Sequence, residues 1–163
     1  MDNDQLFMKQ ALKLAKKAYD QLEVPVGCVI VQNGKIIARS YNQRHTTKNS
    51  LDHAELIAIK KACKKLNQWI LDDCEMYVTL EPCLMCAGAI LQSRIKRLIY
   101  ATNEPKFGSC GSIIDVIENK TFNHQVLLTR YVLEEESKTL LKTFFKEIRA
   151  SKQKVGENNE GNS

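Results

Sequence analysis

Four residues in two short segments of the sequence could together bind a metal ion and move a proton. His53 and Glu55 stand one residue apart in LDHAELIAI, and Cys83 and Cys86 form a C-x-x-C pair in EPCLMC. Imidazole nitrogens and cysteine thiolates are preferred zinc ligands. Cysteines three apart share one face of a helix, and a helix N-terminus stabilises thiolates. The two segments therefore predict a site with three metal ligands.

Three ligands leave a zinc ion with an open coordination position, which is the catalytic arrangement. There the pKa of a bound water falls from about 15.7 to near 7. Such a site also needs a proton carrier that is not itself a ligand. Glu55 lies two residues from His53, so we expect it to face that water.

Three other interpretations of these segments stay open at this stage. Asp52 and Glu55 match a capping box, in which His53 would be an incidental first-turn residue. A C-x-x-C pair also occurs in redox sites, although Leu84-Met85 does not resemble a thioredoxin-like motif. A structural zinc site needs four protein ligands, and Cys110 could supply the fourth.

The composition is that of one soluble globular domain. The chain has 163 residues, enough for a core without disulfides, and it shows neither a signal peptide nor a run of about 18 apolar residues. We therefore expect a cytoplasmic location and free cysteines. The net charge of +5 suits a polyanionic partner, but it is too small to identify a nucleic-acid binder by itself.

The spacing of apolar residues predicts alternating helices and strands, and hence an α/β domain with a mixed sheet. Asn33-Gly34 is a strong hairpin signal between two β-branched runs. Further strands are expected at 75–79, 96–101 and 125–128. Helices are expected at 4–22, 53–66, 82–93, 113–118 and 134–152, with loops at 43–50 and 102–111. Residues 1–152 would form the single domain, and the polar residues 153–163 a disordered tail.

The paired motifs identify a family. H-x-E followed by P-C-x-x-C is the signature of zinc-dependent nucleoside and nucleobase deaminases. Beyond this signature the chain resembles the bacterial tRNA-specific adenosine deaminases over residues 4–150. The segments that carry the resemblance are VPVGCVIV, VTLEPCLMCAGAI, SRIKRLIYA, GSIIDV, FNH and LLKTFFKEIR.

The resemblance implies a three-layer α/β/α deaminase-like fold with about five strands, one Zn²⁺ per chain and a homodimer. The implied reaction converts the wobble adenosine of a tRNA anticodon to inosine, with Glu55 as the proton shuttle and His53, Cys83 and Cys86 as zinc ligands. Residues implied to contact the RNA substrate fall into two groups. Those around the flipped adenosine are Asn42, Val26 and the Ala54 backbone, and those near the anticodon loop are Lys106, Phe145 and Arg149.

Several residues depart from the family pattern. Asp52 replaces a small residue before the zinc histidine, and we expect it to cap the helix or to contact a residue that binds zinc. Glu104 stands where an Asp is usual, and Phe107 replaces a small residue. Outside the loops, Cys28 and Ala101 replace the usual Ala and Gly, respectively. Two other hypotheses stay open, namely a deaminase of free guanine, cytosine or dCMP and a noncatalytic zinc-stabilised RNA-binding module.

Overall fold

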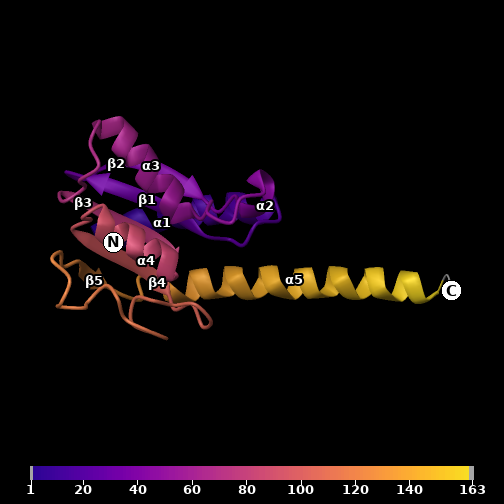
Figure 1. Ribbon diagram of the computed structural model, residues 1–163. Helices are drawn as coiled ribbons and strands as arrows, with labels where there is room; N and C mark the ends of the chain where they lie inside the picture. The colour runs from indigo at the N-terminus through magenta and orange to yellow at the C-terminus, as the bar shows by residue number, and fades with distance from the viewer. Residues whose placement is uncertain (1, 162–163) are drawn as a thin grey trace.

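The computed structural model describes residues 2–161. Its strands are β1 (Gly27–Gln32), β2 (Lys35–Tyr41), β3 (Cys74–Leu80), β4 (Arg97–Thr102) and β5 (Leu127–Thr129). They form one mixed sheet in the order β2-β1-β3-β4-β5 (Figure 1). β1 is antiparallel to β2 and β3, while β3, β4 and β5 run parallel. The expected mixed sheet of about five strands is confirmed.

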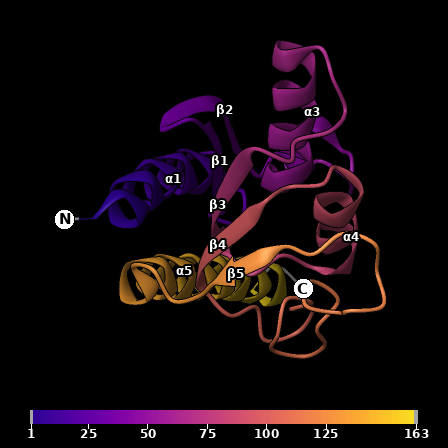
Figure 2. The same cartoon turned by 90° about the vertical axis from the view of Figure 1, so that its left-hand side faces the viewer.

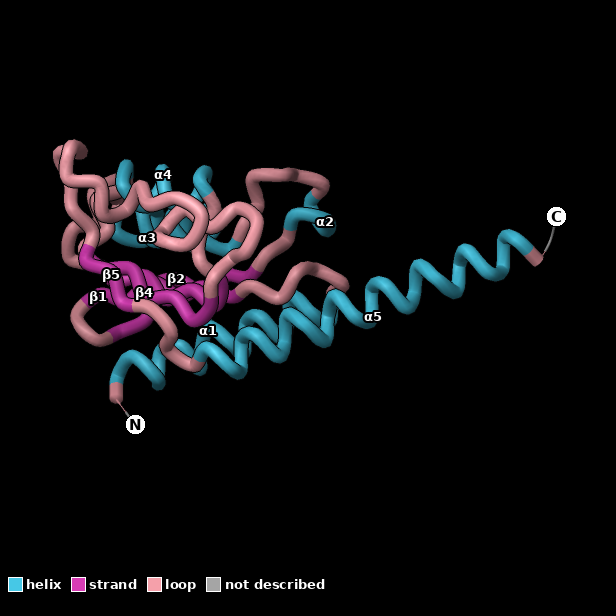
Figure 3. Tube along the Cα trace, turned by 90° about the horizontal axis from the view of Figure 1, so that it is seen from below, coloured by secondary structure: helices cyan, strands magenta, loops and turns pink. Residues whose placement is uncertain are grey.

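Helices cover both faces of this sheet. On one face lie α3 (Ala54–Leu66) and α4 (Leu84–Gln92), and on the other lie α1 (Asn3–Asp20) and α5 (Glu134–Glu160) (Figures 2 and 3). A short helix, α2 (Arg44–Thr47), interrupts the connection from β2 to α3. The predicted three-layer α/β/α architecture is therefore confirmed.

The core consists of two apolar clusters, one on each face of the sheet. Alternation along β1 assigns its side chains to them, because successive residues of a strand point to opposite faces. Cys28 and Ile30 belong to the cluster under α3 and α4. Val29 and Val31 belong to the cluster under α1. The β1–β2 hairpin turns at Asn33 (φ 51°) and Gly34 (φ 74°), the positive values that a type I′ turn requires.

Several predicted element boundaries were wrong. The expected loop at 43–50 contains α2, and residues 113–118 form bends, turns and a bridge rather than a helix. Pro82 precedes α4 by two residues instead of opening it. The last helix continues to Glu160 rather than ending at Lys152, so residues 153–160 are helical instead of a disordered tail. Its exposed end projects from the domain (Figure 1). The backbone hydrogen bonds of a helix form within the helix itself.

Among residues 2–161, none of the helices combines the length and the apolar character that a membrane crossing requires.

Gly27, the first residue of β1, lies directly against α1. A Cβ atom at this position would stand 1.9 Å from the Ala11 carbonyl oxygen and 2.6 Å from the Ala15 amide nitrogen. Both contacts are with helix backbone, which cannot move aside as a side chain can. The close packing of α1 on the sheet therefore depends on a glycine here.

We expect Gly27→Ala to lower the free energy of unfolding by about 1–3 kcal/mol or more, because it overpacks the α1–sheet contact. Urea titration would measure the change. Gly88→Ala is the matched control, since among the described residues the added Cβ meets no heavy atom within 4 Å apart from its chain neighbours and the nearby backbone of its own helix. That control should leave stability unchanged or raise it by about 0.5–1 kcal/mol. Equal stability of Gly27→Ala and the native chain would contradict the contact.

Candidate active site

The structure brings His53, Cys83 and Cys86 together between α3 and α4. The His53 Nδ1 atom lies 3.7 Å from Cys83 Sγ and 3.5 Å from Cys86 Sγ. One ligand atom from each of the three residues lies within 4.8 Å of the others. A tetrahedral zinc ion with ligand distances of about 2.0–2.3 Å fits a group of this size. We name these three residues the ligand cluster.

Both helices begin at the ligand cluster. His53 is the N-cap residue of α3 and Cys83 is the N-cap residue of α4, and both have extended backbone conformations. Cys86 lies in the first turn of α4, and Glu55 lies in the first turn of α3. The unpaired amide groups and the positive dipole ends of two helices thus converge on one point, where they favour negative charge.

The cluster favours thiolate even without an ion. The pKa of Cys83 is lowered from 9.0 to about 4, mainly by the hydrogen bond from Cys86 and also by the bond with His53, although burial opposes the shift. Correspondingly, the pKa of Cys86, which donates that bond, is raised. The hydrogen bond with Cys83 raises the pKa of His53 above 6.5, although burial opposes this. Because thiolate is the form that binds metal, the donor chemistry fits a zinc ion.

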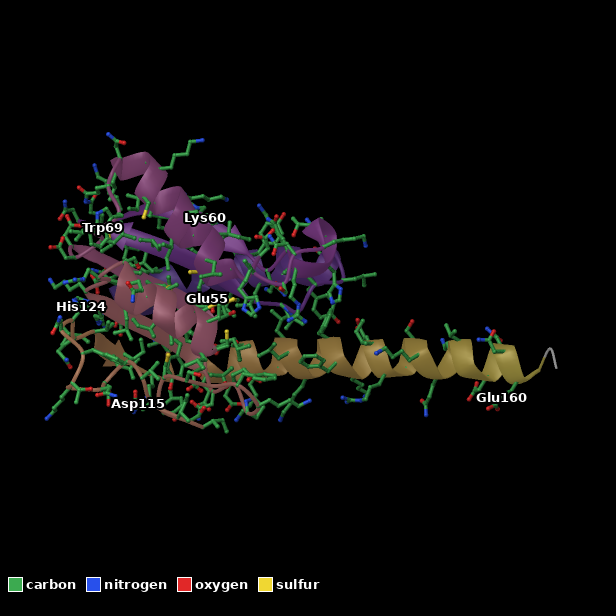
Figure 4. All side chains as sticks on the ribbon, viewed as in Figure 1. Glu55, Lys60, Trp69, Asp115, His124 and Glu160 are labelled. Atoms are coloured by element: carbon green, nitrogen blue, oxygen red, sulfur yellow. The ribbon has the colours of Figure 1, made fainter. Side chains whose placement is uncertain are left out.

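Glu55 is buried beside the cluster, with only 4% of its surface exposed. Figure 4 places it where the first turn of α3 faces α4. Burial is the main cause that raises the pKa of Glu55 above 4.5, and a hydrogen bond with Cys86 opposes that shift. The side chain therefore lies next to the candidate ligands, in the position that a proton carrier would occupy.

The three residues expected around the flipped base lie at the end of the sheet that also carries the ligand cluster. The backbone N–H of Asn42 donates to the Val26 carbonyl at 3.0 Å, and the Ser40 hydroxyl donates to the Ala54 carbonyl at 2.5 Å. Val26, Asn42 and Ala54 are all buried. These bonds tie the end of β2 both to the segment before β1 and to the start of α3.

The three residues expected near the anticodon loop lie on the surface. Lys106 belongs to the β4–β5 loop, whereas Phe145 and Arg149 belong to α5, and all three are exposed. Phe145 is not a core residue, because it is 42% exposed. Its ring packs edge-on against the buried Phe144 at a centroid distance of 5.4 Å. These residues therefore belong to two different elements of the surface.

The structure does not support two of the alternatives considered from the sequence. Within the described residues no side chain caps α3, and the Asp52 carboxylate instead accepts a bond from the Thr47 hydroxyl at 2.6 Å. The capping role expected for Asp52 was therefore wrong. Cys110 lies outside the ligand cluster, with its Sγ atom 3.8 Å from the Pro82 carbonyl oxygen. Burial raises the pKa of the Cys110 thiol, which disfavours the thiolate that a fourth ligand needs.

Sequence reasoning missed two buried carboxylates that shape the loops around the cluster. Glu23 accepts the His45 amide with both oxygens, at 2.7 and 3.1 Å, and so holds the segment that contains α2. Glu81 accepts amides of the β4–β5 loop. The only signal in the sequence was an acidic residue next to an apolar segment, which is too common to predict burial.

The site therefore combines a buried glutamate with a His/Cys/Cys group, at the N-termini of two helices on one face of a mixed sheet. The zinc-dependent deaminases have this arrangement. The chain matches the model of the MafB19-like deaminase family over residues 1–149 and belongs to that family.

Three known proteins illustrate the similarity. The tRNA-specific adenosine deaminase of Bacillus subtilis (strain 168) is 45% identical over 97% of this chain and 98% of its own. A structure from a study of A-to-I editing by tRNA:A34 deaminases at the wobble position of transfer RNA is 40% identical and has a TM-score of 0.80, covering 83% of this chain and 98% of its own. A guanine deaminase from Bacillus subtilis is 36% identical and has a TM-score of 0.60, covering 67% and 80%.

We expect Cys86→Ala to lose most of its bound zinc, because two ligands hold the ion far less tightly than three. Metal analysis after dialysis would measure the loss against about one zinc ion per native chain. Cys110→Ala is the matched control, since it removes a buried thiol outside the ligand cluster and should keep its zinc. Loss of zinc in the control with retention in Cys86→Ala would contradict the assignment.

Proposed function

We propose that this chain is a zinc-dependent hydrolase that converts adenosine to inosine at the wobble position of a tRNA anticodon. The observation that carries the proposal is the buried Glu55 carboxylate directly beside the His53, Cys83 and Cys86 ligand cluster. The preference for tRNA over a free base rests on the 45% identity to a tRNA-specific adenosine deaminase across nearly the whole of both chains.

In this proposal each residue near the cluster has a defined task. His53, Cys83 and Cys86 would hold one zinc ion, which when bound would activate a water for attack on adenine C6. Glu55 takes a proton from that water, delivers it to adenine N1 and assists the departure of ammonia. The net reaction consumes one water and releases one ammonia. Asn42 hydrogen-bonds the flipped base, while Val26 packs against it and the Ala54 backbone meets its edge.

The RNA partner would be the unpaired anticodon loop, whose bases are free to leave the stack. Lys106, Phe145 and Arg149 would contact this loop from the surface of the domain. The net charge of +5 suits a polyanionic substrate. A cytoplasmic location follows for an enzyme that acts on tRNA.

We further propose a homodimer, as the family resemblance implies. Leu51 and Leu84 flank the ligand residues in the sequence and are 53% and 58% exposed, so a second chain could cover them. Sedimentation of the native chain as a monomer at micromolar concentration would contradict a stable dimer.

Glu55→Gln should reduce inosine formation roughly 10²–10⁴-fold, because the amide cannot accept and return a proton. The substrate would be an anticodon stem-loop with adenosine at the wobble position, and the product would be measured by nucleoside chromatography. The variant should keep about one zinc per chain, which separates a chemical defect from loss of the ion. Undiminished turnover in Glu55→Gln would remove this residue from the mechanism.

Free guanine serves as the competing substrate, because a guanine deaminase shares 36% identity with this chain. The native chain should form inosine in the stem-loop and leave guanine unchanged. Guanine turnover without inosine would replace the proposed substrate by a free base. Zinc and RNA binding with no deamination of either substrate would favour a noncatalytic RNA-binding module.

Stem-loop binding should weaken as salt concentration rises, because phosphate contacts release counterions. A plot of log affinity against log salt has a negative slope. Lys106→Ala and Arg149→Ala should each make that slope less steep by about 0.7–1. Lys60→Ala is the charge-matched control. Lys60 is exposed on α3 (Figure 4), and at about 100° per residue it lies roughly 140° around the helix from Glu55. An affinity that does not change with salt would contradict RNA contacts through these cations.

A further inference from the structure

The β4–β5 loop exposes a large aromatic side chain close to the ligand cluster. Phe107 is 69% exposed, and its neighbour Lys106 is also exposed. The loop lies below α4 in two perpendicular views (Figures 1 and 2). Folding alone gives no reason for leaving this ring in water, since exposure of a large apolar side chain contributes nothing to stability.

The turn that carries Phe107 is held by the carboxylate of Glu104. Its Oε2 atom accepts hydrogen bonds from the amides of Lys106, at 3.2 Å, and of Phe107. The Gly108 amide donates to the Glu104 carbonyl at 3.2 Å and closes the turn. Glu104, which is longer than the usual Asp, thus binds amides of its own loop. The ring of Phe107 therefore stands on an ordered turn.

Glu81 joins this turn to the segment that carries the zinc ligands. Its Oε1 atom accepts the Glu104 amide at 3.1 Å, and its Oε2 atom accepts the Cys110 and Ser112 amides at 3.0 and 3.1 Å. The side chain is only 1% exposed, and Cys83 follows two residues later. A Cβ atom on Gly108 would stand 2.5 Å from Glu81 Oε1, so the approach is tight.

A second link places Phe107 near the ligand cluster. The Ser109 amide donates to the Pro82 carbonyl at 3.0 Å, and Pro82 directly precedes Cys83. The Ser109 hydroxyl donates to the Phe107 carbonyl at 2.9 Å. Phe107 stands two residues from Ser109, a span of at most about 7 Å along the chain. A nucleotide beside one bound at the cluster therefore lies within reach of the ring.

We propose that Phe107 is a stacking platform for an unpaired base that flanks the target adenosine, and that Glu81 and Glu104 position it. The inference rests on the proposed RNA substrate. Single-stranded loops are recognised by stacking of splayed bases on aromatic side chains, and Lys106 offers a cation to the adjoining phosphate. Stacking tolerates any base, so Phe107 contributes affinity and placement rather than sequence specificity.

Steady-state kinetics on the anticodon stem-loop test the platform. Phe107→Ala should raise KM about 5- to 150-fold, the loss of one stacked base, and change kcat less than about twofold. Phe107→Tyr should restore the native KM because it keeps the ring. Trp69→Ala is the control, because Trp69 is 62% exposed beyond the C-terminal end of α3 (Figure 4) and should leave KM unchanged.

Fluorescence gives a direct measurement of contact. Phe107→Trp in a Trp69→Phe background leaves one indole, because the sequence has a single tryptophan. Stacking on a base should quench its emission as the stem-loop is added, even if the RNA is not deaminated. Failure of the native chain to form inosine, with quenching present, would contradict the proposed reaction and support the platform.

Glu81→Gln tests the positioning role. Its amide NH₂ would face at least one backbone N–H in either orientation, because both carboxylate oxygens accept amide bonds. Its KM should rise with zinc retained, and the double variant Glu81→Gln/Phe107→Ala should be no worse than Phe107→Ala alone. If the two substitutions raised KM additively, Glu81 would not act through Phe107.

Two outcomes would overturn the platform itself. The first is an unchanged KM together with an indole that the stem-loop does not quench. The second is a Phe107→Ala chain that loses both its activity and the native assembly, as sedimentation would show. Phe107 would then be a contact between chains.

Discussion

The meeting of two helix N-termini on one face of the sheet is the constraint on which the site depends. Two positive dipole ends this close repel each other unless negative charge lies between them. The Cys83 thiolate and the first-turn residues Glu55 and Cys86 supply that charge or the groups that can carry it. A divalent ion would balance the resulting excess of acidic groups. The same arrangement therefore stabilises the helix starts and gathers the candidate metal ligands.

Buried carboxylates have two different uses in this molecule. Glu23 and Glu81 accept backbone amides, which compensates the cost of burying their charge and orders the loops beside the cluster. Glu55 is also buried, but its neighbours are the candidate ligands, and burial raises its pKa. A carboxyl group in such surroundings can change its protonation state. The first two are suited to positioning and Glu55 to proton transfer.

Substrate choice within the family depends on surfaces outside the ligand cluster. Adenosine and guanine deaminases need the same activated water, so a His/Cys/Cys/Glu set alone does not distinguish an RNA loop from a free base. In this chain the β4–β5 loop and α5 present exposed residues outside the ligand cluster. An RNA substrate extends beyond the deaminated base, and only an RNA can use such distant contacts.

The local patterns of the sequence determined most of the elements and the candidate ligand residues. Asn33-Gly34 needs positive φ angles for a hairpin, apolar periods distinguish helix from strand, and His53 and Cys83 stand at helix starts. Tertiary structure decided what Asp52, Glu81 and Cys110 do. Asp52 bonds Thr47 instead of capping α3, and Glu81 meets amides far along the chain. The Cys110 thiol bonds the Pro82 carbonyl and lies outside the ligand cluster. These roles depend on partners brought close only by folding, and no local pattern encodes such contacts.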